Sequence, residues 1–169
     1  MEAIVYTSNT GTTKEYAKLL SDKLSLPYYS LDEIKNKVKP GGKIIYLGWI
    51  MASGVKGYKK AIKDYDVCAV GDVGMGATGT QVKEVRTKNK IPSSKPVFTL
   101  QGGFDVKKLH GIYKLMMTIM VKTAGKGLAN KQDRTQEEDQ MLEMMLHGGK
   151  YVDEKNLKAI LDWYGKRGE

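Results

Sequence analysis

Polar side chains crowd one short segment near the start of the chain. Residues 8–13, SNTGTT, carry hydroxyl and amide groups around a single glycine. The apolar residues 4–6 before them predict a buried strand, and the spacing of Tyr16, Leu20 and Leu24 after them predicts a helix. The first N–H groups of such a helix lack partners and favour an anion, which makes this segment a candidate phosphate site. Its members are Ser8, Asn9, Thr10, Gly11, Thr12 and Thr13.

The composition of this segment limits the kind of phosphate site it can form. It has no Gly-Lys-Ser/Thr sequence, so it is not a Walker loop, and its single glycine excludes the dinucleotide fingerprint. Neutral hydroxyls and helix N–H groups would therefore bind the phosphate. The alternative is an ordinary turn whose Ser and Thr side chains cap the helix.

A second candidate segment follows the strand predicted at residues 43–48. It is apolar, although it stands at a strand end, so it either packs inward or contacts a flat apolar ligand. Trp49 is the side chain best suited to stack on such a ligand, and the alternative is that it fills a gap under the loop. The segment consists of Trp49, Ile50, Met51, Ala52, Ser53 and Gly54.

A third candidate segment follows the strand predicted at residues 66–70. Four glycines in the nine residues 71–79 predict a loop whose backbone can approach a ligand closely. A flexible surface loop is the alternative. The candidate ligand contacts are Asp72, Val73, Gly74, Met75 and Gly76.

Strands and helices are predicted to alternate along most of the chain. Further strands are expected at residues 26–31 and 96–100, and helices at residues 58–63 and 80–89. This alternation predicts an α/β fold with a parallel sheet, in which all three candidate segments follow a strand. The length of 169 residues suits one domain.

The S-x-T-G-x-T pattern at residues 8–13 resembles the phosphate loop of flavodoxins. The resemblance implies a flavodoxin-like doubly wound five-stranded parallel sheet, in the order 2-1-3-4-5, with helices on both faces. It also implies that FMN is the cofactor, with its phosphate at residues 8–13. The segments at residues 49–54 and 72–76 would then border the isoalloxazine ring.

Two stretches make the chain similar to one branch of this family, the menaquinone-dependent protoporphyrinogen oxidases. They are residues 48–54 and residues 102–127, GGFDVKKLHGIYKLMMTIMVKTAGKG. The resemblance implies flavin-dependent oxidoreduction with a quinone or porphyrin. The chain departs from the branch at residues 128–149, which are longer and more acidic and predict a helical insertion.

The helix predicted at residues 106–123 is apolar and dotted with lysines. Asp105 is expected to cap it, and glycines at residues 124–127 to end it. It either packs under the sheet edge or lays part of its face, within residues 106–121, on a membrane surface or a partner. Its predicted inward face consists of Val106, Leu109, Ile112, Tyr113, Met116, Met117 and Met120.

Two more helices are expected near the end of the chain. Asp133 or Thr135 is predicted to cap a methionine-rich helix that ends at residues 147–149, and Asp153 to cap the last helix. The methionine-rich residues 141–146 form core, a lid over the flavin edge, or a contact in a homo-oligomer.

Charge and cysteine content bound the partners and the compartment. The net charge of +9 attracts anionic partners such as acidic proteins or lipid headgroups. No nucleic-acid partner is expected, because aromatic residues do not interleave with the scattered basic ones. A single cysteine, Cys68 in an apolar run, predicts a buried thiol and a reducing cytoplasm. With no signal peptide expected and no apolar run of roughly 20 residues, the expected location is the cytoplasm, with peripheral contact at the inner membrane face.

Three functions are consistent with these features. The first is an FMN-dependent oxidoreductase acting on a quinone or porphyrin. The second is a non-enzymatic electron carrier for an acidic redox protein, and the third is a flavin-free basic interaction module.

No side chain is an obvious catalytic acid or base. His110 and His147 have no metal-ligand spacing around them, so no metal is expected.

Overall fold

The chain alternates strands and helices as far as residue 101 and then leaves the sheet for a group of helices. A computed structural model describes residues 1–104, 109 and 111–167. The first part contains β1 (Ala3–Thr7), α1 (Thr12–Leu24), β2 (Tyr28–Ser30), a 3-10 turn (Ile34–Asn36), β3 (Lys43–Met51), β4 (Gly54–Val55), α2 (Tyr58–Asp64), β5 (Asp66–Gly74), α3 (Val82–Asn89) and β6 (Val97–Gln101). The second part contains β7 (Gly103–Phe104), α4 (Gly111–Met120), a π-helical turn (Val121–Gly125), α5 (Lys126–Ala129), α6 (Gln136–His147), β8 (Gly149–Lys150), a 3-10 turn (Glu154–Leu157) and α7 (Lys158–Gly165).

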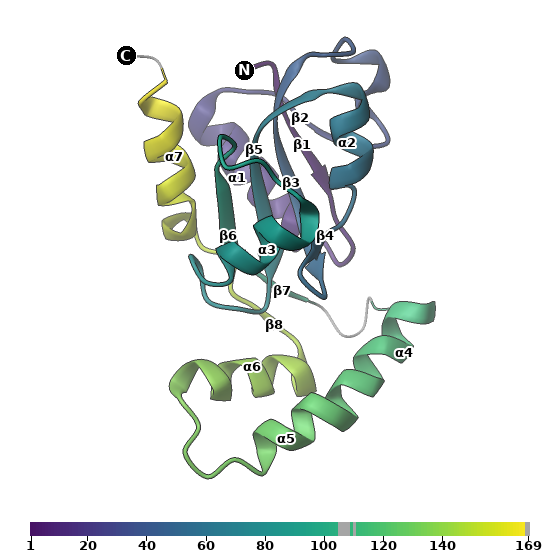
Figure 1. Ribbon diagram of the computed structural model, residues 1–169, viewed down its shortest axis with the longest axis vertical. Helices are drawn as coiled ribbons and strands as arrows, with labels where there is room; N and C mark the ends of the chain where they lie inside the picture. The colour runs from purple at the N-terminus through teal and green to yellow at the C-terminus, as the bar shows by residue number, and fades with distance from the viewer. Residues whose placement is uncertain (105–108, 110, 168–169) are drawn as a thin grey trace.

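A mostly parallel sheet forms the centre of the molecule (Figure 1). Within the described residues, the parallel strands lie in the order β2-β1-β3-β5-β6, and β4 pairs antiparallel with the end of β3. The predicted α/β class with a mostly parallel sheet is confirmed. The sequence does not predict β4 or the separate pair of β7 and β8, because strands of two residues leave no periodic signal.

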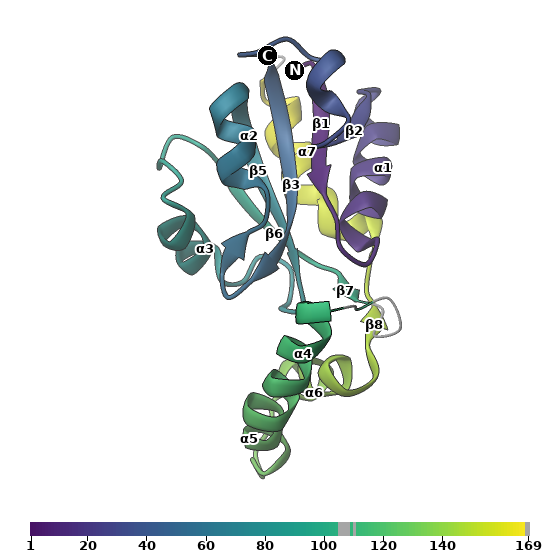
Figure 2. The same cartoon turned by 90° about the vertical axis from the view of Figure 1, so that its right-hand side faces the viewer.

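Helices cover both faces of the sheet. On one face α1 and α7 bury Tyr16 and Ile160 completely, and on the other α2 and α3 bury Tyr58 and Val85. Figure 2 shows α2 and α3 on one side of the sheet and α1 on the other. The strands read as almost continuous apolar runs because both of their faces are buried. Cys68 of β5 is buried in this sheet, as predicted.

β3 runs farther than the sequence predicts. The expected strand ends at Gly48, but β3 continues to Met51, because its last two residues pair with β4. Trp49 therefore belongs to a strand and not to a loop. Ala52 and Ser53 make the turn to β4, both with positive φ (47° and 58°).

β5 also continues beyond its predicted end. Residues 71–74, expected in a glycine-rich loop, are strand, because β3 and β6 pair with β5 along this length. A Cβ atom at Gly71 would lie 2.4 Å from the Leu47 side chain, and one at Gly74 would lie 2.5 Å from Ile50. These two glycines therefore reflect close packing between neighbouring strands.

The helices from α4 to α6, residues 111–147, form a unit that we call the helical arm. Figures 1 and 2 show this arm beyond the carboxyl edge of the parallel strands, apart from the helices that flank the sheet. Its attachment lies near β7 and β8, which pair antiparallel with Phe104 opposite Gly149. The arm therefore leaves and rejoins the α/β body at one place.

The helix predicted at residues 106–123 does not end at its glycines. α4 begins at Gly111, and helical structure continues through the π-helical turn and α5 to Ala129. Gly125 has φ −61°, an ordinary right-handed value, so it does not terminate the helix. The predicted cap Asp105, together with residues 106–108 and 110, lies outside the described residues.

One predicted helix cap is confirmed, and the other caps the 3-10 turn before the last helix and not α7 itself, whose N-cap residue is Leu157. Thr135 accepts a hydrogen bond from the Glu138 N–H, and the Glu138 carboxylate accepts one from the Thr135 N–H, which makes a capping box at the start of α6. The Asp153 carboxylate accepts a hydrogen bond from the Lys155 N–H at the 3-10 turn before α7. Among the described residues, no helix is long and apolar enough to cross a bilayer.

Candidate functional site

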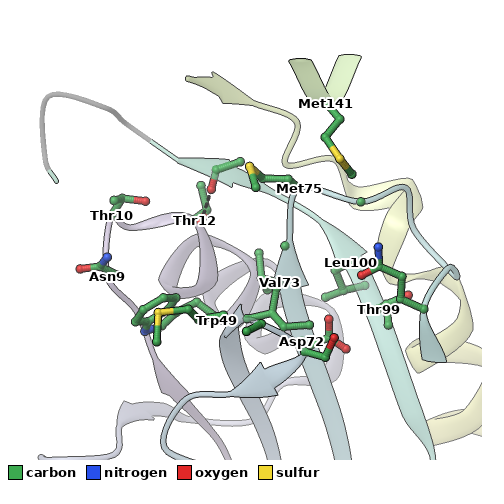
Figure 3. A pocket seen from close by; sticks show the side chains of 18 of the residues that line it. Asn9, Thr10, Thr12, Trp49, Asp72, Val73, Met75, Thr99, Leu100 and Met141 are labelled. Carbon is green, nitrogen blue, oxygen red and sulfur yellow. Dashed lines mark hydrogen bonds between the residues drawn. The ribbon is translucent and has the colours of Figure 1, made fainter. Parts of the chain in front are cut away.

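A pocket of about 460 Å³ opens between the carboxyl edge of the sheet and the helical arm (Figure 3). The segment after β1 and the ends of β3, β5 and β6 border it on the sheet side, and α4 and α6 border it on the arm side. The pocket brings together members of all three segments that the sequence singles out. Most of its wall is apolar, as expected for a site that holds a flat organic ligand.

The first segment contributes to the pocket only in part. Asn9, Thr10 and Thr12 line it, whereas Ser8, Gly11 and Thr13 do not. The α1 N-terminus has no side-chain cap, because the Ser8 hydroxyl accepts its hydrogen bond from the Gly11 N–H and not from the first turn of the helix. This geometry weighs against the alternative of a capped turn and leaves N–H groups of the first turn available.

Backbone shape and one buried hydroxyl also distinguish this segment. Gly11 has φ 107°, a conformation that strongly favours glycine. Thr13 is fully buried, and its hydroxyl has no hydrogen-bond partner in the part of the chain that the structure describes. The Thr12 hydroxyl donates a hydrogen bond to the Gly103 carbonyl at 3.1 Å, which ties this segment to β7.

The second segment lies against the arm. Its first five residues line the pocket, and Gly54 does not. The Trp49 ring meets the Tyr113 ring of α4 edge to face, with 5.2 Å between the centroids, and the Lys56 ammonium lies 5.6 Å from the Trp49 centroid. Trp49 is half-buried, and its contact with Tyr113 joins the end of β3 to α4 at the pocket wall. The five residues of the second segment that line the pocket are Trp49, Ile50, Met51, Ala52 and Ser53.

All of the third segment lines the pocket, including Gly74 and Gly76. Because successive side chains of a strand alternate between faces, Asp72 points to the α3 side and Val73 to the α1 side, where it joins the core. Met75 packs against the arm, in a small cluster with Leu109 and Met144.

Asp72 is the titratable side chain with the most unusual surroundings in the pocket. Its side chain is 3% exposed, and its Oδ1 atom has no hydrogen-bond partner among the described residues. Burial raises the pKa of this carboxyl to about 7, because a charge is poorly solvated there. Thr99 on the neighbouring strand is 6% exposed, and its hydroxyl also lacks a partner within the described ranges.

Sequence reasoning misses about half of the pocket. β6 contributes because parallel strands end at the same edge, a signal that the predicted strand at residues 96–100 already contained. The arm residues 113, 116, 117 and 120 share one helix face, but nothing in the sequence indicates that this face meets the pocket. The residues missed are Ala77, Thr80, Gln81, Thr99, Leu100, Gly103, Leu109, Tyr113, Met116, Met117 and Met120, whereas Met141 belongs to the methionine-rich residues for which a lid over the flavin edge is one predicted role.

The described residues offer no obvious metal centre. Across residues 1–104, 109 and 111–167, no group of three or more His, Cys, Asp or Glu side chains is placed to hold a metal ion.

Comparison with known proteins adds no assignment: no protein-family model matches the chain, and neither the curated proteins nor the solved structures contain a significant match. A functional conclusion therefore depends on the pocket itself.

Proposed function

We propose that this chain is a flavodoxin-like protein that binds FMN and uses it for electron transfer or flavin-dependent oxidoreduction. The main support is that the segment after β1 and the ends of β3 and β5, with the residues just beyond them, border one pocket at the carboxyl edge of the sheet. In open α/β sheets, ligands bind at this edge, where the strand order reverses. The order β2-β1-β3-β5-β6 reverses between β1 and β3, which supports a flavodoxin-like doubly wound fold.

The donors near α1 fit a phosphate group. The uncapped N-terminus of α1 offers N–H groups and the positive end of a helix dipole. Thr10 and Asn9 line the pocket beside it and add neutral hydrogen-bonding groups. We propose that these groups hold the FMN phosphate.

The remaining walls fit an aromatic ring system. Trp49, Met51 and Tyr113 present apolar and aromatic surface from both the sheet and the arm. These side chains would hold the ring and exclude water around it. When bound, FMN supplies the redox chemistry, and the surrounding protein tunes its potential.

The identity of the electron acceptor distinguishes two versions of this function. Resemblance to the protoporphyrinogen oxidase branch favours a quinone or porphyrin. The net charge of +9 favours an acidic redox protein, to which the chain would pass electrons as a carrier. Steady turnover of a water-soluble quinone by the FMN-loaded protein would support the enzyme, and its absence would support the carrier.

Peripheral membrane contact is also proposed, through the outer face of α4. Ile112, Leu115 and Ile119 are exposed there, although they are apolar. Lys114 and Lys122 are exposed on the same helical segment, and their charge complements an anionic lipid surface. This surface would suit a quinone that is dissolved in a membrane.

A comparison of FMN with riboflavin, which lacks the phosphate, tests the phosphate site. Wild type should bind FMN at least tenfold more tightly than riboflavin, as measured by quenching of flavin fluorescence. Thr10→Glu should remove this preference, because its carboxylate repels the phosphate. Thr87→Glu adds the same charge on the exposed side of α3 and should leave the preference intact. Equal affinity of wild type for the two flavins would contradict the assignment.

A further inference from the structure

Asp72 and Thr99 occupy paired positions on the neighbouring strands β5 and β6. Paired residues of parallel strands send their side chains to the same face of the sheet, here the face covered by α3. Both residues line the pocket, and Figure 3 shows them next to each other. The pocket wall therefore has a carboxyl and a hydroxyl side by side.

One oxygen atom of each of these two side chains has no hydrogen-bond partner in the described part of the chain. Asp72 Oδ1 and Thr99 Oγ1 are both buried and both without a hydrogen-bond partner there. An unmade hydrogen bond of a buried polar group costs roughly 1–3 kcal/mol. Two such groups at one point of a pocket indicate that a ligand supplies the missing partners.

Among the described residues, no charged side chain of α3 or β6, and neither Arg86 nor Lys56, is placed to neutralise the Asp72 carboxylate. Arg86 of α3 donates hydrogen bonds to the carbonyl oxygens of Pro92 and Lys95, and Lys56 lies over the Trp49 ring. The other charged side chains of α3, Lys83, Glu84 and Lys88, are exposed, and β6 has none. A ligand that binds the Asp72 carboxylate must therefore bring a hydrogen-bond donor.

We propose that Asp72 and Thr99 form a subsite for the imide edge of the flavin ring, with the Asp72 carboxylate accepting its N–H and the Thr99 hydroxyl donating to an adjacent carbonyl. This inference rests on the proposed FMN function. The oxidised isoalloxazine ring carries one N–H group, which lies between two carbonyl groups. An acceptor beside a donor is the complement of that edge.

Proton release follows from this assignment. Below pH 7 the free carboxyl is mostly protonated, because burial raises its pKa to about 7. An N–H donor binds the ionised form more strongly than the protonated form, so binding of the flavin favours release of the proton to solvent. The Asp72 contribution to flavin affinity should therefore rise with pH, up to tenfold per pH unit below pH 7.

The test compares FMN with its analogue methylated at the imide nitrogen. Wild type should bind FMN at least tenfold more tightly than the methylated flavin, and Asp72→Leu should bind the two within about twofold of each other. Asp66→Leu is the matched control, because Asp66 lies at the opposite end of the same strand, where it pairs with Lys95. This control should keep the wild-type preference.

Titration calorimetry at pH 6.5, in buffers of different ionisation enthalpy, gives a second readout. On binding FMN, wild type should release more protons than Asp72→Leu releases. The variant is the reference because any proton that the FMN phosphate gains or loses on binding is counted in both proteins. If wild type binds both flavins equally, or if Asp72→Leu still rejects the methylated flavin, the subsite is wrong although FMN binding stands. If wild type binds no FMN, the proposed function fails, and the subsite fails with it.

Discussion

The burial of Asp72 lowers the stability of the ligand-free protein at neutral pH. An Asp carboxyl titrates near 4 in an unfolded chain, whereas burial raises its pKa to about 7 in the folded protein. The folded protein therefore holds this proton more tightly than the unfolded chain does. Between pH 4 and 7 the contribution of Asp72 to the free energy of unfolding falls as pH rises, and above pH 7 it changes little.

Urea unfolding of wild type and Asp72→Asn at pH 5, 6, 7 and 8 measures this contribution. The free energy of unfolding of wild type relative to Asp72→Asn should fall by about 2–3 kcal/mol from pH 5 to pH 8. The free energy of unfolding of wild type relative to Asp66→Asn should show no such fall between pH 5 and pH 8. The hydrogen bond from Lys95 lowers the pKa of Asp66, so that carboxyl titrates only in acid. A difference between wild type and Asp72→Asn that does not vary with pH would contradict the account of Asp72.

The sequence predicts Asp72 as a ligand contact but does not predict its burial. The glycines around it suggest an open loop, and only the pairing of β5 with both β3 and β6 turns this segment into strand. Pairing depends on residues far away in the chain, so local composition cannot predict it. Thr99 escapes notice for the same reason, because a lone threonine in a strand has no signal of its own.

At the scale of elements, α4 has two apolar faces with different surroundings. Tyr113, Met116 and Met117 line the pocket, whereas Leu115 and Ile119 are 59% and 52% exposed. The helical spacing predicts the pocket-facing residues correctly as one face. It wrongly adds Ile112 to that face, since Ile112 is exposed. Periodicity alone does not say that the arm leaves the sheet and so packs on one side only.

Vesicle sedimentation tests the outer face of α4. Wild type should sediment with vesicles of anionic lipid at low salt, and Leu115→Glu should weaken this binding at least tenfold, because a carboxylate opposes both insertion and charge attraction. Ile62→Glu is the control, because Ile62 is an exposed apolar residue of α2, 48% exposed. A stable dimer that is lost in Leu115→Glu, with no vesicle binding by wild type, would contradict a membrane contact.

The whole molecule consists of an α/β body and an arm that is joined at β7 and β8. Because Phe104 and Gly149 pair opposite each other, a two-residue Asn-Gly turn can replace residues 105–148 and close a hairpin. The shortened protein should unfold cooperatively, since both large buried clusters lie in the body. It should bind FMN at least tenfold more weakly, because the pocket loses its wall of Tyr113 and methionines.

Circular dichroism and flavin titration of the shortened protein check this division. Unchanged FMN affinity would mean that the arm is not part of the site, and a chain without cooperative unfolding would mean that the body depends on the arm. The α/β class and the three segments of the body that border the pocket are predictable from the apolar runs and from the composition of the segments after them. The position of the arm is not, because its contacts depend on tertiary packing around Met75 and Met144.

The most direct test of FMN binding is a titration of the purified wild-type protein with FMN, followed by flavin fluorescence. We predict saturable quenching at one FMN per chain, at micromolar protein concentration. Riboflavin should quench less under the same conditions, because it lacks the phosphate. If FMN fluorescence stays unchanged at micromolar protein, the flavoprotein assignment is wrong, and the basic surface and the arm would define an interaction module instead.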